Sequence, residues 1–183
     1  MNAITDIVID LKRYPFSKNA LSEITENTWV KRKWPLVYLI NNDKKKLAYV
    51  GETTNAFNRI KNHLANEDGL VLNTITLIGS DRFNKSATLD IESQLIEYLS
   101  AENTYKLQNG NSGLTYHNYY DKPFYRDILE EIWARLKSEK LVSKSIEEIE
   151  NSNLFKYSPY KALSDGQRAS VMEIINTLNT RNY

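Results

Sequence analysis

The sequence predicts an α/β domain of the α+β kind, in which short strands form a small sheet flanked by helices. Three runs of apolar, β-branched and aromatic residues, at 35–40, 47–51 and 70–78, are typical of strands. Longer stretches at 55–65, 86–100 and 123–141 carry apolar residues at helical spacing. A chain of 183 residues is long enough for one such domain with extensions.

Composition excludes several kinds of chemistry and location. The chain contains no cysteine, so disulfides, thiolate zinc sites and cysteine nucleophiles are excluded. Its first residues lack the basic start and apolar run of a signal peptide, and no stretch approaches the roughly 18 apolar residues of a membrane helix. We therefore expect a soluble, cytoplasmic protein.

Basic residues are concentrated in one part of the chain. Residues 31–65 hold eight lysines and arginines against two acidic residues, although the net charge of the whole chain is only +1. Such a block suits a polyanionic partner such as nucleic acid, because lysine and arginine neutralise phosphates. A solvated turn at 43–46 is the simpler explanation of the charge taken alone.

The first half of the chain predicts an extension followed by a hairpin. Apolar residues at helical spacing on either side of Pro15 predict a helical extension over residues 1–30. The strands at 35–40 and 47–51 then pair around a polar, lysine-rich turn. Each strand carries one tyrosine, Tyr38 or Tyr49. Both rings lie near one another only if register and pleat agree, which the sequence leaves open.

The helix at 55–65 is expected to place an arginine away from the core. Thr53 or Thr54 can cap it, and its apolar stripe is Phe57, Ile60 and Leu64. Arg59 falls on another side of the helix, with Asn55 four residues before it and His63 four residues after it. The arginine therefore faces either solvent or a ligand.

The helix at 86–100 carries a carboxylate where an apolar residue is expected. At 100° per residue Glu92 falls inside the apolar arc, whereas the polar side holds Asp90, Ser93, Gln94 and Glu97. Burial of a carboxylate costs several kcal/mol unless it is paired, hydrogen-bonded or bound to a cation. Glu92 is therefore a ligand candidate, or a residue at the helix rim that reaches water or a basic partner.

The rest of the chain predicts a loop and further helices. A polar, glycine-rich loop over 105–113 contains Asn109 and Asn111, although Asn-Gly is also an ordinary turn signal. Beyond it, the helix at 123–141 is amphipathic, and Ser145 to Glu148 form a capping box for a further short helix. A final helix begins after Ser164.

The order of these residues resembles the GIY-YIG nuclease superfamily. The elements that carry the resemblance, over about residues 34–115, are Leu36-Val37-Tyr38, Tyr49-Val50-Gly51, Arg59, the helical Glu92 and an asparagine. The resemblance implies a small three-stranded antiparallel sheet flanked by helices, here with helical N- and C-terminal extensions. It also implies a metal-dependent endonuclease that acts on DNA, duplex or branched, in restriction, repair or phage defence.

The resemblance also implies roles for individual residues. Glu92 would be the single protein carboxylate on Mg²⁺ or Mn²⁺, Tyr38 the general base, Tyr49 its support and Arg59 the phosphate clamp. His63 would lie near the nucleophile, and Asn109, or Asn111 as its rival, would be the family asparagine. Further expected contacts to phosphate or DNA are Gly51, Asn55, Lys44, Lys45, Lys46, Lys61 and Asn111.

Two features depart from the family pattern or extend beyond it. Glu52 stands where many relatives carry a lysine, and Lys44, Lys45 or Lys46 are the candidates to replace that cation. Residues Tyr157 to Gln167 resemble the entry motif of superfamily-one helicases, so a longer protein with an ATPase domain is expected. The predicted division is an extension (1–30), a nuclease domain (31–120), a helical extension (121–150), and a linker and helix leading to that absent ATPase (151–183). The alternative function is a catalytically silent nucleic-acid-binding module.

Overall fold

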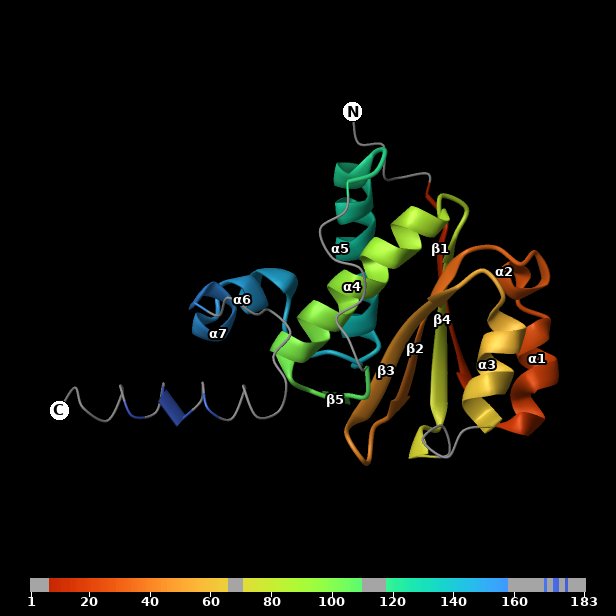
Figure 1. Ribbon diagram of the computed structural model, residues 1–183, viewed down its shortest axis with the longest axis horizontal. Coiled ribbons are helices and arrows are strands. Elements are labelled where there is room, and N and C mark those ends of the chain that lie inside the picture. Colours follow the sequence, from red (N-terminus) through yellow and green to blue (C-terminus); the bar gives the residue numbers. More distant parts are fainter. Residues whose placement is uncertain are drawn as a thin grey trace.

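The computed structural model describes residues 7–65, 71–109 and 118–157, together with residues 170, 173, 174 and 177. Its centre is a five-stranded mixed sheet in the order β1-β4-β2-β3-β5 (Figure 1). Neighbouring strands are antiparallel except for β3 and β5, which are parallel. The strands are β1 (Ile9–Pro15), β2 (Leu36–Asn42), β3 (Leu47–Thr53), β4 (Thr74–Ser80) and β5 (Lys106–Leu107).

The predicted three strands are present, but a sheet of three strands and a purely helical N-terminal extension are wrong. Residues 9–15 form β1, which pairs with β4 from Ile9 opposite Ser80 to Pro15 opposite Thr74. Pairing with a buried neighbour overrides the helical spacing of the apolar residues, and Pro15 is tolerated because it ends an edge strand. β5 is only two residues long and has no apolar pattern of its own, so nothing in its sequence predicts a strand.

One face of the sheet is covered by three helices (Figure 1). These are α1 (Leu21–Thr25), preceded by the 3-10 turn η1 (Lys18–Ala20), α2 (Thr28–Lys31) and α3 (Ala56–Ala65). Helix α3 follows Asn55, whose side-chain oxygen accepts a hydrogen bond from the backbone N–H of Asn58 at 3.3 Å. The capping residue is therefore Asn55 rather than Thr53 or Thr54. The buried stripe consists of Ala56, Ile60 and Leu64, whereas Phe57 is 40% exposed.

The other face is covered by α4 (Lys85–Glu102), and α5 (Lys122–Ser138) packs behind it, followed by α6 (Ile146–Glu150) and α7 (Asn153–Tyr157). Because α4 lies between the sheet and α5, the side of α4 that carries the polar residues in the sequence pattern is partly buried. Asp90 and Ser93 are both buried. Asp90 is stabilised there by Lys122 at 3.3 Å and by a hydrogen bond from the Tyr119 hydroxyl at 3.0 Å.

The capping box is confirmed at the start of α6: the Ser145 hydroxyl accepts from the Glu148 N–H, and the Glu148 carboxylate accepts from the Ser145 N–H.

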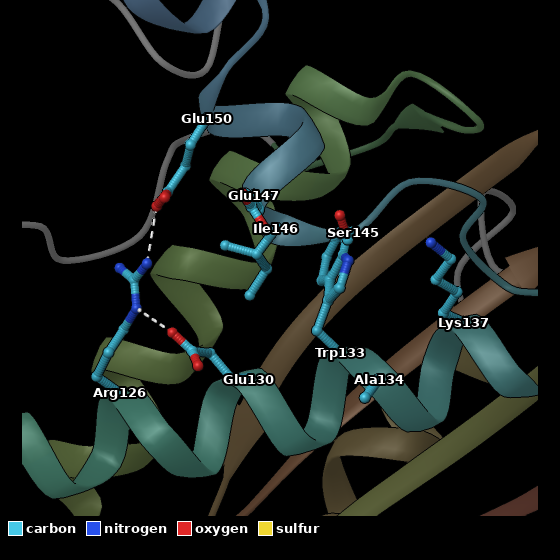
Figure 2. A pocket seen from close by; sticks show the side chains of 9 residues that line it. All are labelled: Arg126, Glu130, Trp133, Ala134, Lys137, Ser145, Ile146, Glu147 and Glu150. Carbon is cyan, nitrogen blue, oxygen red and sulfur yellow. Dashed lines mark hydrogen bonds and ion pairs between the residues drawn. The ribbon is translucent and has the colours of Figure 1, made fainter.

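Figure 2 shows the hollow between α5 and α6, where Arg126 bonds Glu150 at 2.7 Å and Glu130 at 3.3 Å. The Arg126–Glu150 ion pair links α5 to α6, and no predicted site residue lines this hollow. The predicted final helix lies largely outside the described residues. Among the helices that the structure describes, none is both long and apolar enough to cross a membrane.

Candidate active site

Tyr38 lies at the centre of the site, in the interior strand β2. Its ring is fully buried on the face covered by α3, and its strand neighbour across the hairpin is Gly51. A Cβ atom at position 51 would lie 2.2 Å from the Tyr38 hydroxyl oxygen. Only glycine therefore leaves room for the Tyr38 ring to cross β3, which gives a steric reason for the Tyr-x-Gly spacing.

The second tyrosine lies on the same face, and α3 supplies two groups that reach both rings. The Tyr38 and Tyr49 rings are stacked with their centroids 6.2 Å apart. Arg59 donates from Nε to the Tyr38 hydroxyl at 3.0 Å and from Nη2 to the Tyr49 hydroxyl at 3.1 Å. His63 follows one helical turn later, with its Nε2 3.0 Å from the Tyr38 hydroxyl. The register that the sequence left open is the one that brings these four side chains together.

Burial shifts the pKa values of Tyr38 and His63 in opposite directions. Burial raises the pKa of Tyr38 well above its ordinary value, and the hydrogen bond from Arg59 opposes this rise only in part. Burial and the nearby Arg59 lower the pKa of His63, so its imidazole is neutral at pH 7. Arg59 donates to the Tyr38 oxygen, so in the tautomer of His63 that carries its proton on Nδ1, the phenol proton is donated to His63 Nε2. Tyr38 and His63 thus form a pair between which a proton can move.

Glu92 approaches the site from the opposite face, on α4. It is half-buried, and its pKa is raised to about 7, first by burial and then by the neighbouring Glu52 carboxylate. A hydrogen bond from the Glu52 backbone and the charges of Lys85 and Arg59 lower the pKa and limit the rise. Glu92 also contributes to the raised pKa of Tyr38, so the two groups interact electrostatically.

These two faces meet at the outer edge of β3. β5 pairs with β3 only at Leu47 and Ala48, and within the described residues no strand continues beyond them. The side-chain amide of Asn109 then replaces a strand, accepting from the Val50 N–H at 3.0 Å and donating to the Val50 carbonyl at 2.8 Å. The next outward-facing residue is Glu52, whose backbone bonds Glu92. Side chains of Asn109 and Glu92 thus complete the edge that β5 leaves open.

The remaining predicted residues lie at various distances from this cluster. The three lysines of the turn are exposed at the other end of the hairpin, about 17 Å along β3 from Gly51 at roughly 3.4 Å per residue. Lys61 is exposed, two residues beyond Arg59 and so on another side of α3. Asn55 caps α3, and Asn111 lies outside the described residues. The structure therefore joins Tyr38, Tyr49, Gly51, Arg59 and His63 directly, and Glu92 and Asn109 along the edge of β3.

A divalent metal fits the donor set at Glu92. Within the described residues, no group of three or more histidine, aspartate and glutamate side chains gathers to hold a metal. Mg²⁺ is usually bound through one or two carboxylates while water and substrate phosphate fill its other positions. Glu92, oriented by the Glu52 N–H, meets that requirement with one carboxylate, and the adjacent Glu52 supplies further negative charge.

Lys85 and Thr88, which the sequence did not single out, both contact Glu52. Lys85 forms an ion pair with one oxygen of the Glu52 carboxylate, and the Thr88 hydroxyl donates to the other at 3.2 Å. Lys85 and Thr88 are three residues apart on α4, and Glu92 follows Thr88 by four, so all three lie along one side of the helix. This spacing was visible in the sequence, but the pairing with Glu52 depends on how α4 packs against β3.

The cluster thus combines a tyrosine–histidine hydrogen bond, an exposed guanidinium and a nearby carboxylate. Comparison with protein families matches residues 35–114 to the GIY-YIG catalytic domain, so this part of the chain is a GIY-YIG domain, as the resemblance over about residues 34–115 predicted. Proteins with this domain are typically nucleases that use a divalent metal. No curated protein and no solved structure matches significantly. The helicase-like resemblance begins at Tyr157, beyond the matched residues, and residues 158–169 lie outside the described part, so it stays a prediction.

Proposed function

We propose that this chain is an endonuclease that hydrolyses DNA phosphodiester bonds with the help of one divalent metal at Glu92. The observation that carries the proposal is the convergence of Tyr38, Tyr49, Arg59 and His63 on one face, beside Glu92. DNA is the substrate that a GIY-YIG domain suggests. The concentration of basic residues in 31–65 supports a polyanionic substrate.

The proton path begins at Tyr38. As the attacking water adds to phosphorus, its proton passes to the Tyr38 oxygen while the phenol proton passes to His63 Nε2. The P–O bond to the leaving strand breaks, and its departing oxygen takes a proton from solvent water. Tyr38 therefore acts as a base without forming a free phenolate, which its raised pKa would otherwise oppose. Since His63 is neutral before the reaction, it is in the form that accepts this proton.

Arg59 has to serve both the tyrosines and the phosphate. The guanidinium is exposed and bonds both phenols through two of its five donors. It covers the buried Tyr38 hydroxyl, so a bound phosphate would draw Arg59 outward and open Tyr38 to the attacking water. There Arg59 would offset the charge that develops on the phosphate oxygens.

The acidic side of the site belongs to Glu92. In its ionised form Glu92 would hold Mg²⁺ or Mn²⁺, and the metal would supply polarisation of the phosphate. Asn109 keeps the β3 edge, and with it Tyr49 and Gly51, in place through its bonds to Val50.

Exposure favours Tyr49 as a second candidate for direct contact with the attacking water. Tyr49 is half-buried, whereas Tyr38 is fully buried. The two phenols can be separated by substitution, because each loses only its hydroxyl in Tyr38→Phe or Tyr49→Phe. The variant of the residue that accepts the proton should lose about 10²–10⁴-fold in kcat, and the other variant less.

The proposal is tested by cleavage of plasmid, linear, single-stranded and branched DNA with Mg²⁺ or Mn²⁺. Cleavage by the wild type and its loss in a folded Glu92→Ala variant are the expected results. Cleavage that persists in Glu92→Ala would refute the site assignment. DNA binding by the wild type without cleavage of any substrate would instead show the alternative, a catalytically silent binding module.

A further inference from the structure

Glu52 and Lys85 form an ion pair at the border between the candidate site and solvent. The Glu52 side chain is only 11% exposed and is bonded through both oxygens, to Lys85 and to Thr88. The Lys85 side chain is 54% exposed and stands on the first turn of α4. The carboxylate is thus fixed by the protein, whereas the ammonium it holds is open to solvent.

The ammonium of Lys85 has donors left for a ligand. A lysine side chain carries three N–H donors and, among the residues that the structure describes, Lys85 donates to Glu52. The charge of Lys85 also reaches Glu92, where it acts with Arg59. Two cations, Arg59 and Lys85, therefore face two carboxylates, Glu52 and Glu92. Without Lys85, Arg59 alone would face both carboxylates, and these side chains by themselves would carry a net negative charge.

The turn lysines and Lys61, which also belong to the basic 31–65 block, do not provide this cation. The turn lysines lie at the far end of the hairpin from Gly51, and Lys61 projects from another side of α3 than Arg59 does. Lys85 follows that block by twenty residues in the sequence, yet its contact with Glu52 places it directly after the Tyr-x-Gly segment of β3.

We propose that Lys85, held in position by Glu52, is a phosphate-binding residue of this site. In this role Glu52 is a positioning residue: it fixes the ammonium beside Glu92 and neutralises part of its charge, and Lys85 keeps two donors for a DNA phosphate. Lys85 has this role only if the chain binds DNA at this site, as proposed above.

The test measures how DNA binding depends on salt. Each phosphate that a lysine neutralises contributes about 0.9 to the slope of log K against log salt on duplex DNA. Binding of a fluorescently labelled branched duplex is followed by anisotropy in EDTA, so that no cleavage occurs, between about 50 and 200 mM salt. The variants are Lys85→Met, Lys85→Gln and Lys85→Arg. The matched control is Lys137→Met, because Lys137 is 43% exposed and also pairs with a glutamate, Glu148, but lies on α5.

Lys85→Met and Lys85→Gln should each reduce the slope by about 0.9, whereas Lys85→Arg and Lys137→Met should keep the wild-type slope. Two neutral variants are used so that poor folding of one does not decide the result. If both fold and keep the wild-type slope, Lys85 is a structural ion-pair partner only and the proposal is wrong. A wild type that neither binds nor cleaves DNA would overturn the proposed function as well, which distinguishes the two failures.

Discussion

Substitution of Gly51 by alanine tests whether the position of Tyr38 matters for the reaction. The added Cβ would lie 2.2 Å from the Tyr38 hydroxyl oxygen and 2.3 Å from Cζ, where ordinary contact begins at 3.4 Å. The phenol would therefore have to move by about 1.2 Å, the difference between 3.4 and 2.2 Å. Arg59, His63 and the buried surroundings of Tyr38 oppose that movement.

Two quantities should change in Gly51→Ala. Overpacking of this kind costs about 1–3 kcal/mol in the free energy of unfolding, which urea denaturation measures. Displacement of a reacting group by about 1 Å costs on the order of 10²-fold in rate, which single-turnover DNA cleavage measures. The loss of rate should therefore exceed what the loss of stability alone explains.

Gly79→Ala is the matched control. A Cβ there would lie 2.3 Å from the Trp29 ring, a clash of similar severity, but at β4 and without contact to Tyr38. It should lower stability to a similar extent and leave the cleavage rate of the folded protein unchanged. If Gly51→Ala folds and cleaves like Gly79→Ala, the position of the Tyr38 ring over Gly51 does not matter for the reaction, and the proposed role of this contact is wrong.

Two further predictions concern the carboxylate and the edge of β3. The pKa of Glu92 rises on folding from 4.5 to about 7, so its contribution to stability is present below pH 4.5 and is lost as the pH rises through about 7. The full rise corresponds to about 3 kcal/mol, which solvent screening of a half-buried group reduces to about 1–2 kcal/mol. Glu92→Gln should therefore be more stable than the wild type at pH 8 and similar to it at pH 4, and equal urea midpoints at pH 8 would contradict this. Asn109→Ala leaves two backbone groups of Val50 without their partner and should cost about 1–2 kcal/mol; amide exchange at Val50 that is no faster than in the wild type would argue against this role of Asn109.

The sequence predicted those parts of the structure that depend on local chemistry. The hairpin, the capping box at Ser145 and the placement of Arg59 away from the core follow from turn residues, hydrogen-bonding types and helical spacing. β1 and β5 could not be predicted, because each is a strand only through pairing with a neighbour distant in sequence. The burial of Asp90 was missed for a similar reason: α5 covers a helix face that looks solvent-exposed in the isolated pattern.

In the candidate site, too, local features could be predicted from the sequence and contacts between distant segments could not. Tyr38, Arg59 and His63 were chosen through the family resemblance, because spacing alone left the register of the hairpin open. Glu92 could be singled out as a carboxylate in an apolar arc, but the sequence did not reveal what orients its side chain. The Glu52 N–H orients it, and the contacts of the Glu52 side chain with Lys85 and Thr88 were likewise invisible. Glu52 is a departure from the family pattern in sequence and a well-bonded residue in structure.

The short length of β5 is what allows the two faces of the sheet to share one site. Tyr38 and Arg59 belong to the α3 face and Glu92 to the α4 face, and a complete sheet between them would keep them apart. On the described residues β5 stops opposite Ala48, so the backbone of Val50 and Glu52 is bonded by the side chains of Asn109 and Glu92 rather than by another strand. A longer β5 would occupy those backbone groups and displace the carboxylate from the edge. The open edge of β3 is therefore a requirement of the site, because a carboxylate from one face can meet a tyrosine from the other only there.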